Sequence, residues 1–483
     1  MLERAMRSLT AITAIGAVAV LAAPGCGDGG TTFVEGSSGG NGGGDGGDLL
    51  GGGDASDAKA CTGLCLRQKN CANGTQTSLS GSVYDPAGRV PLYNVVVYVP
   101  NAPLSDIKDG ASCDQCGTVS GDPLVVALTD SAGNFKLQNV PVGKDIPLVM
   151  QVGKWRRQVT LPMDVQECAD NALTTPALKD LTRLPKNKNE GNIPLMALTT
   201  GGADALECLL RKIGVEDTEF TVGAGTGRVH FYAGHNGSTR FDPGHGGQNF
   251  GATAPFWSNA DNLKKYDIVL FSCEGTSDPG SKPQAALDAL GAYTSAGGRV
   301  FSSHWHRYWL WAHNDGNGSA VGNSPFTNLG AWNDHDPDPP NPINANVDTS
   351  FPKGQAMHDW LANVNALPGG TLPIRNSRHN IDSVTPPGTT SWISIDYSGL
   401  HSVQYLSFNT PQSAPDDKKC GRVVYSDLHV SADSNGDRAG QPWPQGCVTQ
   451  ELSPQEKALE FMLFDLSSCI QSDSKPPSIP GPK

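Results

Sequence analysis

Polar side chains that could do chemistry follow three apolar runs of the sequence. Cys273 comes after YDIVLFS, His304 and His306 come after GGRVFSS, and Asp427 and His429 come after GRVVYS. A thiol near an imidazole can act as nucleophile and base, and two imidazoles with a carboxylate can hold a metal ion. The candidate catalytic residues are therefore Cys273, His304, Asp427 and His429. The candidate ligands of a divalent metal are His304 and His306, which would share one face if their strand continued.

The elements that must position these side chains are those of an open α/β sheet. From about Leu198 onwards, strand-like and helix-like segments alternate, and the run at 266–271 is almost continuously apolar, as a buried parallel strand requires. The SPQE motif at 453–456 predicts the start of a last helix. Because such a fold places its crevice at the carboxyl ends of its parallel strands, we expect the candidate residues to converge there. In the alternative interpretation, Cys273 is buried or disulfide-bonded, and the histidines form local hydrogen bonds.

The stretches YDIVLFSCEG, AGGRVFSSHWH and GRVVYSDLHV resemble the class I glutamine amidotransferase-like superfamily. The closest likeness is to trehalose-utilisation (ThuA-like) proteins, whose second strand also follows a Gly-Gly pair and ends in a histidine. The resemblance covers residues 195–470 and implies a flavodoxin-like α/β domain with a long insertion at about 305–415. In the amidotransferases, the nucleophilic cysteine lies on the tight turn that here reads Ser302-Ser303-His304. The resemblance therefore implies a domain without glutaminase activity.

The expected insertion contains aromatic and acidic segments. A dense aromatic run suits sugar-ring or partner binding, but such runs more often pack in a core, which is what we expect here. Its members are Trp305, Tyr308, Trp309 and Trp311. The acidic loop lacks the glycine and the final glutamate of an EF-hand, and we expect it to be a solvated turn. Its members are Asp334, Asp336 and Asp338.

Residues 79–165 alternate short β-rich runs with turn motifs, which predicts a small antiparallel β-sandwich. Through SGSVYDPAG, NVVVYVP and DSAGNFKLQNVPVG, this segment resembles the carboxypeptidase regulatory-like domain, a transthyretin-like sandwich. The resemblance implies a spacer or an interaction module. No histidine begins an HxxE or HExxH motif, so the sequence does not support a zinc-peptidase site.

The N-terminus predicts export. Two arginines precede an apolar stretch at 11–23 that is too short to span a bilayer, and Pro24-Gly25-Cys26 resembles a lipobox, although Ala23 stands where leucine is preferred. We expect a lipoprotein signal peptide at 1–26 with Cys26 as the lipidated residue. Ordinary cleavage, with Cys26 as a spare thiol, is the alternative. Half of residues 27–54 are glycine, which predicts a disordered tether at 27–58.

The cysteine count indicates the compartment in which the protein works, and the net charge indicates which partners it can bind. Twelve cysteines suit an exported protein, and the eleven that remain after Cys26 leave one unpaired or paired between chains. Three of them lie in a Cys-rich segment at 59–78, and we expect Cys113 and Cys116 to form a local disulfide. The net charge of −13 excludes a nucleic-acid partner. Residues 471–483 are expected to form a disordered tail.

The sequence predicts a lipid-anchored protein of the cell envelope, at the outer membrane or cell surface, held there by its lipid. Its expected role is binding or recognition of a carbohydrate or protein partner, and no cofactor is required for that role. The alternative is a hydrolase of carbohydrate or amide substrates that uses Cys273 or a His304/His429 centre. A divalent metal would assist that enzyme in a third interpretation.

Overall fold

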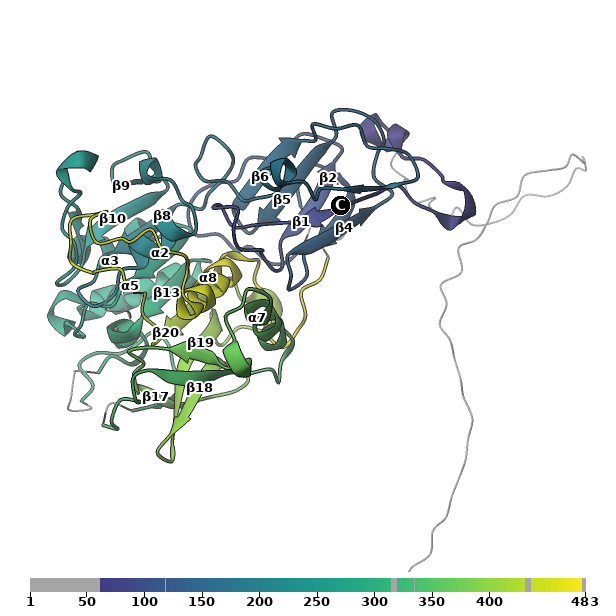
Figure 1. Ribbon diagram of the computed structural model, residues 1–483. Helices are drawn as coiled ribbons and strands as arrows, with labels where there is room; N and C mark the ends of the chain where they lie inside the picture. The colour runs from purple at the N-terminus through teal and green to yellow at the C-terminus, as the bar shows by residue number, and fades with distance from the viewer. Residues whose placement is uncertain (1–60, 118, 314–318, 334, 431–435, 480–483) are drawn as a thin grey trace, which may run out of the picture. The chain divides into compact units, whose positions relative to one another are not determined.

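The computed structural model describes residues 61–117, 119–313, 319–333, 335–430 and 436–479. The predicted signal peptide, Cys26 and the tether lie outside the described residues. The chain is a multidomain mixed α/β protein in which small, mainly antiparallel sheets accompany one large mixed sheet with helices (Figure 1). Within the described ranges, no helix is long and apolar enough to cross a membrane.

The segment expected to form a sandwich contains two small sheets. Strand β4 buries every second residue, Phe135 and Leu137, as period-two patterning requires. One sheet has the order β4-β1-β7 and the other the order β3-β2-β5-β6. Their strands are β1 (Ser78–Ser82), β2 (Val96–Pro100), β3 (Pro123–Leu128), β4 (Asn134–Gln138), β5 (Pro147–Val152), β6 (Trp155–Thr160) and β7 (Asp170–Ala172). The short helix α1 (Pro176–Lys179) follows them.

The large sheet has eleven strands in the order β11-β10-β8-β12-β13-β20-β19-β18-β15-β16, and β9 pairs with β10. Strands β8 to β13 and β20 pair in parallel, whereas β19, β18, β15 and β16 are added antiparallel. The parallel strands are β8 (Met196–Thr199), β9 (Phe220–Val222), β10 (Val229–Ala233), β11 (Gly251–Ala252), β12 (Ile268–Phe271), β13 (Arg299–Ser303) and β20 (Gly421–Ser426). The antiparallel strands are β15 (Ile343–Val347), β16 (Leu372–Ile374), β18 (Thr390–Tyr397) and β19 (Leu400–Thr410).

Helices cover both faces of the parallel part, which explains its continuous apolar runs. Ile268 and Leu270 of β12 pack into one core, and Val269 and Phe271 pack into the other. The first core contains α2 (Leu206–Lys212), α7 (Pro352–Asn363) and α8 (Pro454–Ser467). The second contains α3 (Thr253–Trp257), α4 (Ala260–Leu263), α5 (Gln284–Ser295) and α6 (Tyr308–Trp311). The predicted capping box is present, because Ser453 and Glu456 each accept a hydrogen bond from the other's backbone N–H at the start of α8.

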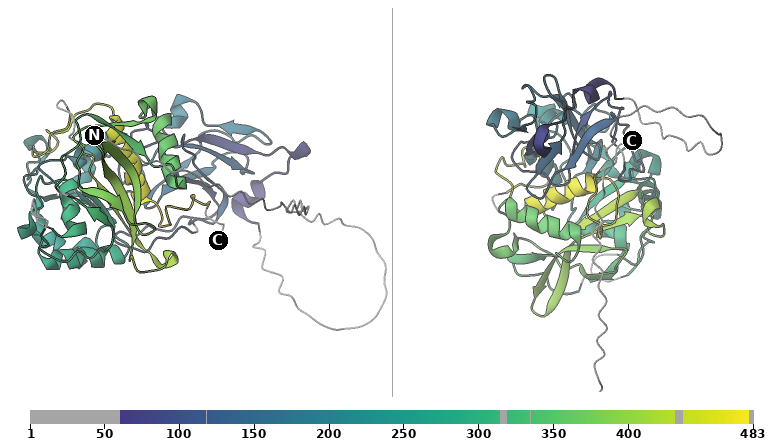
Figure 2. Two further views of the ribbon diagram at one scale, coloured as in Figure 1. Left: turned by 90° about the horizontal axis from the view of Figure 1, so that it is seen from below. Right: turned by 90° about the vertical axis from the view of Figure 1, so that its right-hand side faces the viewer.

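The region at 305–415 is more regular than an insertion of loops with a few strands. Its strand at 403–408 is part of β19, which lies directly beside β20 in the large sheet, and β18, β15 and β16 continue the sheet outward (Figure 2). Strand β19 is buried along most of its length, which explains why it joins the core. A separate pair, β14 (Gly330–Trp332) and β17 (Ile381–Val384), lies off this sheet.

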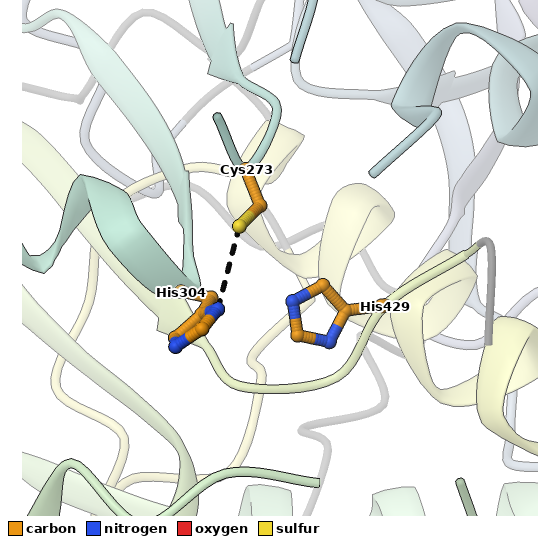
Figure 3. Close-up of side chains that lie close together, drawn as sticks. All are labelled: Cys273, His304 and His429. Atoms are coloured by element: carbon orange, nitrogen blue, oxygen red, sulfur yellow. Dashed lines mark hydrogen bonds between the residues drawn. The ribbon is translucent and has the colours of Figure 1, made fainter. Parts of the chain in front are cut away.

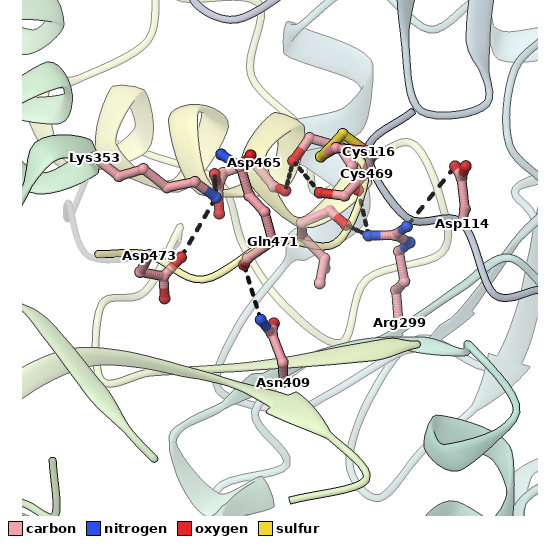
Figure 4. The surroundings of a disulfide bond; sticks show 11 residues. Asp114, Cys116, Arg299, Lys353, Asn409, Asp465, Cys469, Gln471 and Asp473 are labelled. Atoms are coloured by element: carbon pink, nitrogen blue, oxygen red, sulfur yellow. Dashed lines mark hydrogen bonds and ion pairs between the residues drawn. A yellow bond between two sulfur atoms is a disulfide. The ribbon is translucent and has the colours of Figure 1, made fainter. Parts of the chain in front are cut away.

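The expected local disulfide between Cys113 and Cys116 is wrong. Cys116 bonds Cys469 (Figure 4) and Cys113 bonds Cys420, because their loop lies against the large-sheet part of the chain. There Ile470 N–H donates to the Asp114 carbonyl at 2.8 Å. The remaining bonds are Cys61–Cys65, Cys71–Cys168 and Cys208–Cys447, and Cys273 is the one free cysteine of the described residues.

The expected disordered tail begins with an ordered segment. Asp473 is buried and contacts Lys353 at 3.4 Å (Figure 4). It also contacts Arg422 at 2.9 Å. The buried Asp465 of α8 contacts the same two cations. Two cations and two carboxylates therefore fix the chain after α8, since unpaired charges are costly to bury.

Candidate functional site

Three of the predicted residues meet at the carboxyl ends of neighbouring strands. Cys273 follows β12, His304 follows β13 and His429 follows β20, and these strands are adjacent in the sheet. The Cys273 sulfur lies 3.3 Å from His304 Nδ1, and the two imidazole rings lie edge to face with centroids 5.1 Å apart. One potential ligand atom from each residue lies within 4.8 Å of the others (Figure 3). The three side chains converge at the edge where this fold class binds ligands.

His304 occupies an unusual backbone conformation. It begins the 3₁₀ turn η6 (His304–Arg307) with a φ of 34°, which a residue with a β-carbon rarely adopts. Such strain of about 1–3 kcal/mol persists only where the surroundings enforce it, and it is common at functional sites. The turn aims the imidazole back at Cys273 instead of continuing the strand.

Asp204 fixes the strand ends around the site, and it is not among the residues predicted from the sequence. Its carboxylate accepts hydrogen bonds from Ser303 Oγ at 2.7 Å and from the Val430 backbone N–H at 2.8 Å. These two residues neighbour His304 and His429. Gly201 also serves the site, because a β-carbon there would lie 2.1 Å from the Cys273 carbonyl oxygen. Neither residue carries a motif that could have shown this role.

Burial keeps all three site residues neutral at pH 7. Loss of solvent raises the pKa of the Cys273 thiol to about 12, even though backbone N–H groups of Trp305 and Gly275 oppose the shift. Burial, followed by repulsion from His429, holds the pKa of His304 well below its usual value, and burial lowers that of His429 to about 4. The histidine therefore does not generate a thiolate, and the site offers a thiol beside two neutral imidazoles.

Asp427 lies near this cluster but has other partners. One of its oxygens accepts hydrogen bonds from Tyr425 Oη at 2.7 Å and from Asn380 Nδ2 at 2.8 Å, and the other has no hydrogen-bond partner among the described residues. Burial raises its pKa to about 7. Asp427 is therefore a neighbour of the three residues and does not orient the ring of His304 or of His429.

His306 does not join His304 in a metal site. The strand ends at Ser303, so the two histidines leave the turn in different directions. His306 Nε2 lies 3.0 Å from the Ser272 carbonyl oxygen, and Nδ1 accepts a hydrogen bond from Trp309 at 2.8 Å. Both ring nitrogens are occupied, and the ring stacks on Phe271. His306 is a core residue in this structure.

The aromatic run divides between core and surface. Tyr308 and Trp309 are buried in the core, as expected, whereas Trp305 and Trp311 keep part of their surface exposed. Asp336 of the acidic loop is half-buried, and it forms a second cluster with His379 and Asp382 in which potential ligand atoms again lie within 4.8 Å of one another. The amide of Asn333 bridges the two carboxylates of that cluster.

No protein-family model matches the chain, and no curated protein matches it. Two solved structures share limited similarity, both of type II cohesin–X-dockerin complexes from Acetivibrio cellulolyticus, mutated at a C-terminal or an N-terminal interface. They are 15% and 12% identical, and the matches cover 30% and 31% of this chain and 75% and 78% of theirs. The TM-scores are 0.14 and 0.15.

Proposed function

We propose that the protein is a zinc protein of the cell envelope and that Cys273, His304 and His429 hold the metal. The observation that carries this proposal is the convergence of one sulfur and two neutral imidazoles, with potential ligand atoms within 4.8 Å of one another. Thiolate and imidazole are the ligands that zinc prefers in proteins. The metal ligands predicted from the sequence were His304 and His306. In this proposal Cys273 and His429 take the place of His306 beside His304.

The electrostatics favour a metal over a cysteine nucleophile. A thiol with a pKa of about 12 carries almost no thiolate at neutral pH, and Cys273 has no exposed surface. Imidazoles that resist protonation suit a cation, since only the neutral ring is a ligand. Zinc binding would displace the thiol proton, which burial alone opposes.

Three protein ligands are the number that catalytic zinc sites use, because the fourth position of the tetrahedron stays open for water or substrate. The chemistry that zinc would supply there is activation of water for hydrolysis. We therefore favour a metal-dependent hydrolase of carbohydrate or amide substrates. Glutaminase activity is not part of this proposal, since the turn that carries the nucleophilic cysteine in the amidotransferases here reads Ser302-Ser303-His304.

A second candidate is recognition without chemistry. The burial of the centre favours it, because only about 6% of His304 and 5% of His429 is exposed to solvent. In this interpretation the metal stabilises the strand ends, and a carbohydrate or protein partner binds elsewhere. The carboxypeptidase regulatory-like segment at 79–165 would then be the interaction module.

Five disulfides indicate an extracytoplasmic protein. Anchoring through a lipid on Cys26, with a tether that presents the described part at the outer membrane or cell surface, completes the proposal. Labelling with a fatty-acid analogue tests the anchor, and Cys26→Ala should abolish the label while export continues.

Metal analysis of the full chain, purified after export to an oxidising compartment, tests the zinc centre. We expect about one zinc per chain in the wild type, and a large loss in Cys273→Ser and His429→Ala. His401→Ala is the matched control, because His401 is exposed and pairs with Asp396 on a surface hairpin. Circular dichroism confirms that each variant is folded. A folded Cys273→Ser protein that retains the wild-type zinc content would refute the proposal.

Chromogenic glycoside and amide substrates then separate the two candidates. Hydrolysis that requires zinc and is lost in His429→Ala supports the enzyme. A zinc-loaded wild type without any such activity, but with a retained carbohydrate or protein partner, supports recognition.

A further inference from the structure

Arg307 is a buried cation that has no anionic partner in the part of the chain that the structure describes. Only about 4% of the residue is exposed, no ion pair to its guanidinium is found among the described residues, and Nη1 has no hydrogen-bond partner. The ring of Trp305 covers one face of the guanidinium, with Cζ 4.0 Å from the ring centroid. This cation–π contact leaves the N–H donors at the guanidinium edge unused.

The other buried cations of the described chain show that this is an exception. Lys282 pairs with Glu274, Lys212 with Glu456 and Asp437, and Lys353 with Asp465. Arginines at equal depth either pair with carboxylates or donate to side-chain or backbone oxygens, as Arg422, Arg183, Arg299, Arg156 and Arg157 do. Because a buried charge without a partner is costly, an unpaired arginine at this depth requires a compensating group, and the described residues do not provide one.

Arg307 lies at the candidate centre. It is the last residue of η6, the turn that begins with His304. Burial and His429 lower the pKa of His304 most strongly, and the charge of Arg307 lowers it further. Burial raises the pKa of Asp427, and the same charge opposes that larger effect. Asp427 does not pair with Arg307: no ion pair within 4.0 Å joins them, and Asp427 Oδ1 instead accepts hydrogen bonds from Tyr425 Oη and Asn380 Nδ2. The charge of Arg307 therefore acts on groups of the candidate centre.

We infer that Arg307 binds an oxyanion, a carboxylate or phosphate group, on the ligand of the Cys273–His304–His429 centre. The guanidinium presents a planar fork of N–H donors that matches the oxygens of either group. The inference rests on the proposed function for the statement that this ligand is the one handled at the centre. It narrows the ligand to an anionic one, such as an acidic sugar or a substrate with a free carboxylate.

Titration with inorganic phosphate and with acetate, followed by calorimetry and thermal unfolding, tests this inference on the full exported chain. We expect saturable binding of one of the two anions, with a raised Tm, and an affinity at least about tenfold lower in Arg307→Met. Without anion, Arg307→Met should unfold at a higher temperature than the wild type, because the variant buries no unpaired charge. Arg89→Gln is the matched control, since Arg89 is exposed, pairs with Glu451 and is not part of the centre. The control should respond like the wild type.

The variants separate this inference from the zinc proposal. Cys273→Ser should lose zinc and keep anion binding, whereas Arg307→Met should keep zinc and lose anion binding. Wild-type protein that binds zinc but neither anion overturns the inference about Arg307 and leaves the zinc centre standing. An anion response of equal size in Arg307→Met is a bulk salt effect and also overturns it. The anion that binds more tightly, phosphate or acetate, shows whether the ligand carries a phosphate or a carboxylate group.

Discussion

The bond between Cys116 and Cys469 should contribute much of the stability that holds the end of α8 against the rest of the protein. The chain-entropy model relates the stabilisation by a disulfide to the length of the loop it closes. With Cys113–Cys420 still formed, the additional loop contains about 52 residues, which corresponds to about 4 kcal/mol. We expect the double variant Cys116→Ser/Cys469→Ser to lose about this much free energy of unfolding.

Urea unfolding followed by fluorescence measures the loss, and a second disulfide supplies the control. Cys61–Cys65 spans only 4 residues, so Cys61→Ser/Cys65→Ser should lose about 2 kcal/mol by the same relation. Both variants remove two sulfurs and keep the other four bonds, so that loop length is the main difference. Equal losses, or a larger loss for the short loop, would refute the reasoning from chain entropy.

Three further predictions concern buried groups. Burial and the nearby carboxyl of Asp85 hold the pKa of Glu460 well above its usual value, so the folded state loses stability as the pH rises above about 4.5. Glu460→Gln should therefore flatten the curve of Tm against pH between about pH 5 and 8. An unchanged slope would contradict this. Burial alone would raise the pKa of Asp473, but the positive charges of Arg422 and Lys353 outweigh burial and lower this pKa to about 2. The contribution of Asp473 to stability is therefore lost as the pH falls from 3.8 towards 2. Asp473→Asn should cost about 3–5 kcal/mol at pH 7 in urea unfolding, and a loss below about 1 kcal/mol would count against the buried network. Gly201→Ala should displace the Cys273 backbone and lower zinc content more than Gly280→Ala, since a β-carbon on Gly280 would meet no atom within 4 Å; equal zinc contents would contradict this.

The sequence was sufficient to predict the part of the site that depends on topology. Short, almost continuous apolar runs are typical of parallel strands between two helical layers, and parallel neighbours bring their carboxyl ends to one edge. Cys273, His304 and His429 follow three such runs, and the structure brings them together. The odd cysteine count also predicted one free thiol, and Cys273 is that residue in the described chain.

The rest depended on contacts between distant segments, which carry no local signal. His306 has strand spacing from His304, but the strand stops one residue before His304, and the turn sends the two rings apart. Cys113 and Cys116 have the spacing of a local pair, yet each bonds a cysteine more than 300 positions away. Lys212 and Glu456 form one buried ion pair although 244 positions separate them in the sequence. The sequence shows such residues as charged groups or thiols, but it does not show which distant residues they contact.

The zinc and anion proposals together account for the charge at the centre. Without bound groups, burial leaves a neutral thiol, two neutral imidazoles and the positive charge of Arg307. A divalent cation on a thiolate and two imidazoles would add one further positive charge, and the low-dielectric surroundings would penalise two buried positive charges strongly. An oxyanion on Arg307, or ionisation of Asp427, whose pKa lies at about 7, would offset that excess. Anion affinity should therefore be higher in zinc-loaded protein than in zinc-free protein. Linkage requires the reciprocal effect, a higher zinc affinity in the presence of the anion.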